Sequence, residues 1–69
     1  MELERIKKHK KNKAIEIYET AKKNHIDVSE TDLSVTLGLI DNSSSVDEVE
    51  YFFSNYDQMV NKLYKMEVE

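Results

Sequence analysis

The sequence predicts an all-α fold, a small three-helix bundle in which residues 1–69 form a single domain. Three observations favour it: the chain has no proline and one glycine, it has no cysteine, and its apolar residues recur at steps of three and four. An all-β domain of this size would need several turns, which depend heavily on glycine and proline. Without cysteine, disulfides and thiolate zinc sites are excluded. Helix packing, or dimerisation that completes the core, must therefore supply the stability.

The first predicted helix covers residues 2–25. Its second half has one apolar face, formed by Ala14, Ile17 and neighbours at helical spacing. His25 follows near the end, where we expect it to cap carbonyl groups and interact with the helix dipole. Residues 1–13 are basic and place polar groups on every side of the helix, so we expect them to project or fray as an N-terminal extension.

Residues 30–40 are predicted to form the second helix. Leu33, Leu37 and Ile40 would face inward, and Ser29 would be the N-cap. Residues 33–39 also alternate apolar and small side chains, which is a strand pattern. A lone strand would need a partner, and the chain offers none of matching length, so we favour the helix.

The third predicted helix covers residues 46–66 and carries the clearest apolar stripe. Ser45 followed by Glu48 predicts a capping box at its start. The stripe must be covered either by the rest of the chain or by a second copy. In the second case, self-association would use Phe53, Tyr56, Val60 and Leu63.

The segment Leu33–Leu39, with the loop and helix that follow, resembles the first helix and turn of a helix-turn-helix motif. The resemblance covers about twenty residues and implies that helix 46–66 would read DNA. The loop at 41–45 is longer than the usual turn of that motif, and the helix after it begins with carboxylates that offer few donors to base edges. We therefore interpret Gly38 as the C-cap of the second helix.

Charge is divided sharply along the chain. Residues 1–25 carry eight Lys/Arg and four Glu, whereas residues 26–69 carry two Lys and ten Asp/Glu. No Lys or Arg occurs between Lys23 and Lys62, a stretch that holds eight acids. In the simplest interpretation, the two halves partly neutralise each other once packed, through exposed pairs worth at most about 1 kcal/mol each.

The acidic half also suits a protein partner, because a surface of one sign attracts a basic partner and repels nucleic acid. We predict a non-catalytic protein-binding module, a small regulator, adaptor or inhibitor of a larger protein. By base rate, accessory proteins of phages and mobile elements are often of this kind. The expected acidic face comprises Asp41, Asp47, Glu48, Glu50 and Tyr51.

Two alternatives stay open. A nucleic-acid-binding regulator would contact phosphates through its basic N-terminal segment, with salt-dependent affinity. A structural homo-oligomer, such as a homodimer, would use the apolar stripe of residues 46–66. The residues expected to contact nucleic acid are Arg5, Lys7, Lys8, Lys10, Lys11 and Lys13.

We expect no enzyme activity, no cofactor and no metal, and we assign no catalytic residue. One glycine leaves no phosphate-cradling loop. His9 and His25 stand sixteen positions apart, without metal-binding spacing. No apolar run approaches the roughly 20 residues of a membrane span, and the N-terminus lacks the apolar run of a signal peptide. The expected location is cytoplasmic.

Overall fold

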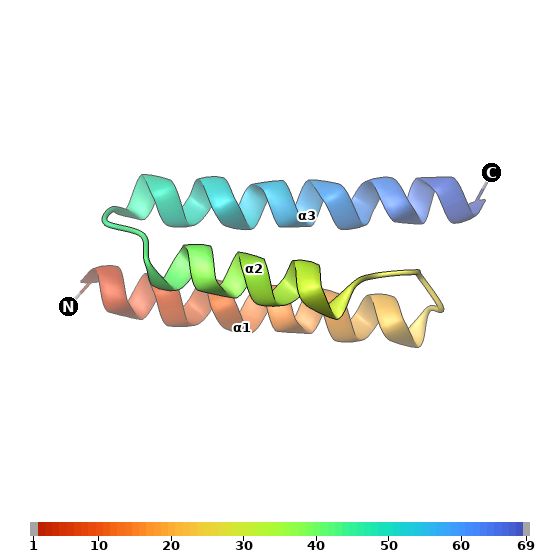
Figure 1. Ribbon diagram of the computed structural model, residues 1–69, viewed down its shortest axis with the longest axis horizontal. Coiled ribbons are helices and arrows are strands. Elements are labelled where there is room, and N and C mark those ends of the chain that lie inside the picture. Colours follow the sequence, from red (N-terminus) through yellow and green to blue (C-terminus); the bar gives the residue numbers. More distant parts are fainter. Residues whose placement is uncertain (1, 69) are drawn as a thin grey trace.

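The computed structural model describes the backbone of residues 2–68 and the side chains of residues 2–66. It contains helices α1 (Glu2–Lys23), α2 (Glu30–Asp41) and α3 (Val46–Val68). Helix α2 runs antiparallel to the other two, which run in the same direction (Figure 1). Over the described backbone there is no strand, so the predicted all-α three-helix bundle is confirmed, and so is the choice of helix for the middle segment.

Helix α2 is about half as long as its neighbours, with 12 residues against 22 in α1 and 23 in α3. The molecule is accordingly elongated, 42 Å long and 17 Å across. Each helix packs against both others, and α2 lies over the middle of the other pair (Figure 1). One side of α2 is therefore buried, and among residues 2–68 no other element covers its opposite side.

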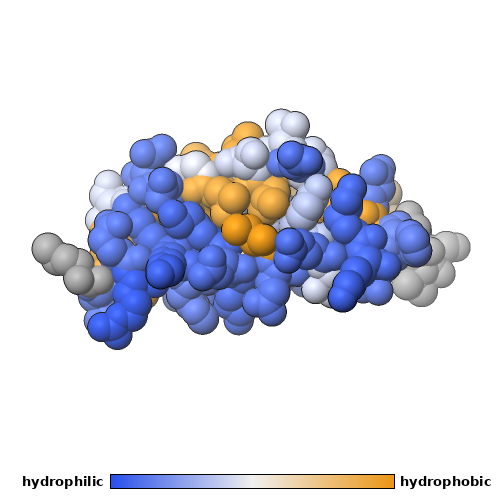
Figure 2. All heavy atoms as spheres, turned by 90° about the horizontal axis from the view of Figure 1, so that it is seen from below, coloured by the Kyte–Doolittle hydropathy of each residue, from blue (hydrophilic) through white to orange (hydrophobic). Residues whose placement is uncertain are grey.

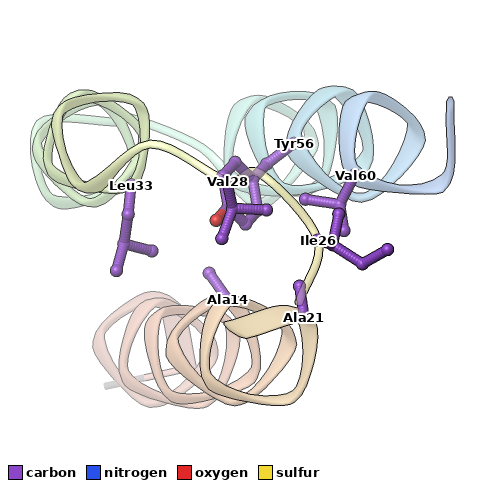
Figure 3. Close-up of a cluster of buried hydrophobic side chains, with 7 residues drawn as sticks. All are labelled: Ala14, Ala21, Ile26, Val28, Leu33, Tyr56 and Val60. Carbon is purple, nitrogen blue, oxygen red and sulfur yellow. The ribbon is translucent and has the colours of Figure 1, made fainter. Parts of the chain in front are cut away.

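The core takes side chains from all three helices and from the α1–α2 loop (Figure 3). Ile40 and Val49 are completely buried as well, and burying an aliphatic side chain of this size contributes about 1.5–3 kcal/mol. Two of the seven clustered residues are alanines of α1, whose small size lets the other elements approach that helix closely. The cluster comprises Ala14, Ala21, Ile26, Val28, Leu33, Tyr56 and Val60.

Helix α1 ends in a Schellman motif. The N–H of Ile26 donates to the carbonyl of Ala21 at 2.9 Å, and the N–H of His25 donates to the carbonyl of Lys22 at 3.0 Å. This places His25 in the left-handed region, with φ of 61°. The predicted end at residue 25 and the predicted capping by the His25 side chain are wrong. The exposed His25 lies beyond α1, because the backbone must reverse there to bring Ile26 into the core.

The two ends of α2 differ in how well the sequence predicted them. Ser29 is the N-cap as predicted, and its Oγ accepts from the Asp32 N–H at 3.3 Å. Gly38 is not the C-cap: the helix continues to Asp41, and Asn42 donates its N–H to the Gly38 carbonyl at 3.0 Å. The added turn brings Ile40 into the interior.

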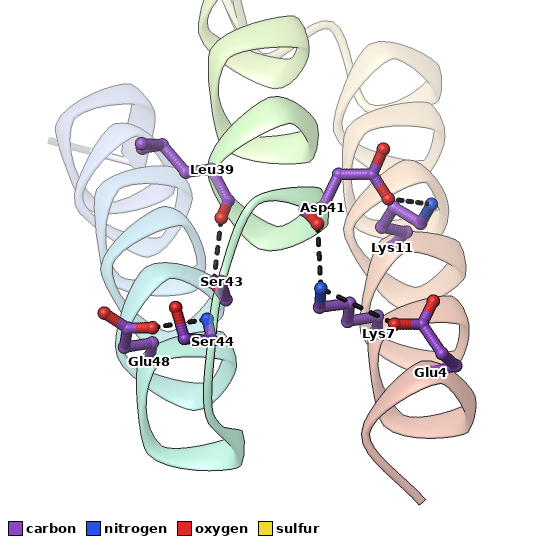
Figure 4. Close-up of polar contacts among 8 residues, drawn as sticks. All are labelled: Glu4, Lys7, Lys11, Leu39, Asp41, Ser43, Ser44 and Glu48. Carbon is purple, nitrogen blue, oxygen red and sulfur yellow. Dashed lines mark hydrogen bonds and ion pairs between the residues drawn. The ribbon is translucent and has the colours of Figure 1, made fainter. Parts of the chain in front are cut away.

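Two hydrogen bonds from backbone N–H groups to side chains cap the start of helix α3. Ser45 Oγ accepts from the Glu48 N–H at 3.3 Å, as in the predicted capping box. The Glu48 carboxylate accepts from the Ser44 N–H at 2.6 Å, one residue before the position that a standard box uses (Figure 4). These bonds fix the α2–α3 loop against the start of α3.

Candidate functional site

The basic N-terminal segment is part of α1 and is docked against the bundle. Lys7 occupies an inward position of α1 and is only 8% exposed. Its ammonium donates to the carbonyl of Asp41 at 2.8 Å and lies 3.7 Å from the Glu4 carboxylate (Figure 4). Asp41 is the last residue of α2, so Lys7 brings a positive charge to the negative end of that helix dipole. The prediction that residues 1–13 project or fray is therefore wrong at Lys7.

Two more lysines of the segment contact other helices. Lys11 donates to the Asp41 carboxylate at 2.8 Å, and the Lys10 ammonium stands 4.7 Å from the centre of the Phe53 ring. The hydrogen bond from Lys11, followed by its charge, lowers the pKa of the Asp41 carboxyl below its usual value. Three of the six residues predicted to contact nucleic acid, Lys7, Lys10 and Lys11, therefore make contacts within the chain.

The other three, Arg5, Lys8 and Lys13, are exposed on α1. At 100° per residue they are spread over an arc of about 140° around the helix. They share the outward side of α1 with Glu16 and Glu19, which are exposed as well. This side of α1 carries charges of both signs rather than a continuous basic surface.

The predicted acidic face lies where α2 ends and α3 begins. Asp47, Glu48, Glu50 and Tyr51 are all exposed in the first turns of α3, and the Tyr51 side chain is 64% accessible. The Tyr51 ring meets the Phe52 ring edge to face, with centroids 5.6 Å apart. Asp41 is also exposed, but its carboxylate is occupied by Lys11.

Few ion pairs join the basic residues 1–25 to the acidic residues 26–69 in the described part of the chain. Of the eight acids between Lys23 and Lys62, Asp41 is the only one within ion-pair distance of a lysine or arginine among residues 2–66. The other seven comprise six exposed carboxylates and the half-buried Asp57. The acidic part of the surface is therefore open to a partner from outside the chain.

The residues predicted for self-association belong largely to the interior of the single chain. Tyr56 is 3% and Val60 1% exposed, and both contribute to the core in Figure 3. Phe53 and Leu63 are half-buried and pack against the same core. The chain thus covers Tyr56 and Val60 by itself and leaves Phe53 and Leu63 partly exposed.

Sequence reasoning missed the outward side of α2. Leu33 and Ile40 point inward. At 100° per residue, three residues on the outward side of α2 lie about 140–180° from them, and Leu39 lies at the edge of that side, about 100–120° away. All of those residues are exposed, with Val35 at 56% and Leu39 at 43%. We call this set the α2 strip, and it consists of Thr31, Val35, Gly38 and Leu39.

The alternation of apolar and small residues over 33–39 could have predicted this surface, because in a helix it places apolar residues on two sides. In a helix only one side can be buried against the bundle, so the other must stay uncovered. The helix was predicted from the sequence, but the exposure of Val35 and Leu39 that follows from it was not.

The apolar surface continues from the α2 strip into a hollow between α1 and α2. Ile15 and Leu37 are half-buried there, and the hollow has a volume of about 420 Å³. Figure 2 views the molecule from the α1 side and shows apolar surface in the middle of that face, with hydrophilic side chains below it and residues of intermediate hydropathy along its upper border. The polar part of the lining comprises Lys8, Lys11, Asn12 and Asp41.

In the part of the chain that the structure describes, no three His, Cys, Asp or Glu side chains gather as metal ligands. None of the described helices is both long and apolar enough to cross a membrane. Comparison of the sequence and structure with known protein families, curated proteins and solved structures finds no significant match. Function must therefore be inferred from the residues of this chain.

Proposed function

We propose that this chain is a non-catalytic protein-binding module, a small regulator, adaptor or inhibitor that docks on a larger protein. The observation that carries the proposal is the uncovered apolar side of α2, where Val35 and Leu39 are exposed one turn apart. Exposed aliphatic side chains are ordinary when scattered, but a set that continues into a hollow with apolar residues in its lining, here Ile15 and Leu37, is typical of an interaction site.

The acidic first turns of α3 support the same proposal. They add an exposed aromatic residue, Tyr51, and tyrosine is enriched in protein interfaces. Their carboxylates have no lysine or arginine partner among residues 2–66. Such a surface can steer a basic partner towards the chain.

A nucleic-acid partner has less support. Lys7, Lys10 and Lys11 make contacts inside the chain. Releasing them for phosphate contacts would cost those interactions. The exposed cations of α1 stand beside carboxylates of the same helix, which reduces the attraction for phosphate.

The proposal is tested by site-specific photo-crosslinking of the full chain in the cells that make it. A photoreactive residue at position 39 is expected to form an adduct with another protein, and one at position 5 is the comparison. Excess unlabelled chain should compete the adduct away, while an excess of the Val35→Ser/Leu39→Ser double variant should not. Adducts with nucleic acid at position 5 and none with protein at position 39 would overturn the proposal.

A further inference from the structure

We infer that the partner segment seated on α2 is an amphipathic helix with an apolar strip and basic residues along one edge. This inference rests on the proposed function and specifies the partner's chemistry. It follows from the shape of the α2 strip and from the charges at its borders.

The shape of the strip suits a helix. Thr31, Val35, Gly38 and Leu39 follow the i, i+4, i+7, i+8 pattern of one helix side. The strip contains no charged residue, and a Cβ atom added at Gly38 would have no atom within 4 Å. A partner backbone can therefore approach closely between Val35 and Leu39. Helices that bind grooves commonly present apolar anchors at the same spacings.

The charges at the borders of the strip are mostly negative. Helix α2 contains three acids and no basic residue. Asp41 lies on the border with α1 and is paired with Lys11. At 100° per residue, Asp32 lies on the opposite side of α2 from Asp41, which is the side towards α3.

The border with α3 is acidic. The Glu48 carboxylate accepts a hydrogen bond from Ser44 in the α2–α3 loop. Phe53 marks the side of α3 that faces α1, and Glu48 lies on a different side of the helix. Asp32 and Glu48 have no lysine or arginine within ion-pair distance among residues 2–66. Exposed Lys8, by contrast, stands at the α1 border. The basic edge of the partner is therefore the one that faces α3.

A second copy of the chain fits this surface less well. In a symmetric dimer formed around the strip, both copies bring the same acidic α2 to the contact. A stable interface also buries about 800 Å² per partner, and the strip exposes only two large aliphatic side chains. A longer helix from another protein can cover the strip, the hollow at Ile15 and Leu37, and the acidic border together.

The test uses nuclear magnetic resonance titration of the isotope-labelled full chain with three synthetic peptides of about 18 residues, long enough to form a helix. The first has leucines at helical spacing and lysines elsewhere. The second has the same leucines with glutamates. The third has the composition of the first in an order without an apolar side. We expect the first peptide to bind with shifts confined to α2, its hollow and the start of α3, and the third about tenfold more weakly.

Two double variants and two matched controls locate the binding. Val35→Ser/Leu39→Ser should weaken the first peptide about tenfold, whereas Met66→Ser, which changes an exposed apolar residue elsewhere, should not. Asp32→Asn/Glu48→Gln should weaken it about fivefold, whereas Glu16→Gln/Glu19→Gln should not. The Glu48→Gln change keeps a side-chain oxygen for the Ser44 N–H, and circular dichroism verifies that each variant folds.

Each contrary result has a distinct meaning. Equal binding of the first and third peptides would show unspecific charge attraction and overturn the inference. Equal binding of the glutamate peptide at the α2 strip would overturn the basic partner and leave the proposed protein-binding function standing. Absence of binding by all three peptides would also overturn the inference, and the crosslinking result at position 39 would then decide the proposed function separately.

Discussion

At the scale of single residues, His25 and Tyr56 each have a feature that lowers the stability of the folded protein. His25 has a left-handed backbone although it carries a Cβ atom, and Tyr56 has a buried hydroxyl without a hydrogen-bond partner in the described part of the chain. A left-handed residue other than glycine costs about 1–2 kcal/mol. An unpaired buried polar group costs about 1–3 kcal/mol.

Replacing His25 with glycine should stabilise the protein. Glycine adopts the left-handed conformation without steric cost, and the exposed His25 side chain gives up no burial. We expect the free energy of unfolding to rise by about 1 kcal/mol in urea denaturation. His25→Ala is the control and should give no gain, because alanine retains the Cβ atom. A loss of stability in His25→Gly would contradict the assigned Schellman motif.

Replacing Tyr56 with phenylalanine should leave stability unchanged or raise it by about 1 kcal/mol, because it removes the unpaired hydroxyl and keeps the buried ring. The change should also alter the response to alkaline pH. Burial raises the pKa of Tyr56 above its usual value of 10.0, with smaller contributions from Tyr18 and Asp32. The folded protein then holds this proton more tightly than the unfolded chain does.

The stability linked to Tyr56 is consequently complete below pH 10 and declines as the pH rises further, through the folded-state pKa. Denaturation of Tyr56→Phe between about pH 7 and 11 should show a shallower alkaline decline than the wild type. Tyr51→Phe, at an exposed position, should leave that decline unchanged. A marked destabilisation of Tyr56→Phe at neutral pH would indicate that the hydroxyl has a partner.

At the scale of the helices, the sequence was informative about where each element lies and less so about how it ends. The apolar periodicity of residues 46–66 and the N-caps Ser29 and Ser45 identify local features, and the structure confirms them. The end of α1 and the C-cap of α2 depend on contacts with residues distant in the sequence. Lys7 lies 34 positions from Asp41, so no local pattern could connect them.

The Lys7–Asp41 contact explains why a basic segment without an apolar side can still pack. The aliphatic part of the lysine is buried and its ammonium meets the C-terminal carbonyl of α2. Lys7→Met keeps an apolar chain of similar length but removes the donor and its charge. We expect a loss of about 1–3 kcal/mol in the free energy of unfolding.

Lys8→Met is the control for that prediction, because Lys8 is exposed on the same helix. It should change the stability by less than about 0.5 kcal/mol. Amide exchange should also accelerate at the end of α2 in Lys7→Met and not in Lys8→Met. Equal stability of the two variants would mean that Lys7 does not cap α2.

At the scale of the whole molecule, the apolar residues fall into those that one chain buries and those that it leaves uncovered. Val60 belongs to the first class and Val35 to the second. The sequence therefore predicts only the acidic part of the candidate surface and not its apolar part. Acidic residues can be counted in a sequence, but exposure of α2 depends on its packing between two longer helices.

A pair of aspartate substitutions tests this division. Val60→Asp buries a carboxylate without a partner, at a cost of several kcal/mol, and small proteins have only about 5–15 kcal/mol of stability in total. We expect it to abolish cooperative thermal unfolding by circular dichroism. Val35→Asp should fold with a transition close to that of the wild type. Folding of both variants alike would contradict the assigned core.

The structure implies above all that one chain fills its own core and leaves α2 as an exposed helix. An isotope-filtered nuclear Overhauser measurement on a mixture of labelled and unlabelled chains examines this without any substitution. The Tyr56 ring should show cross-peaks to Leu33 and Ala14 within the labelled chain, as their common place in the core requires. Cross-peaks from labelled Tyr56 to Leu33 of unlabelled chains would contradict the single-chain core, because a second copy would then complete it.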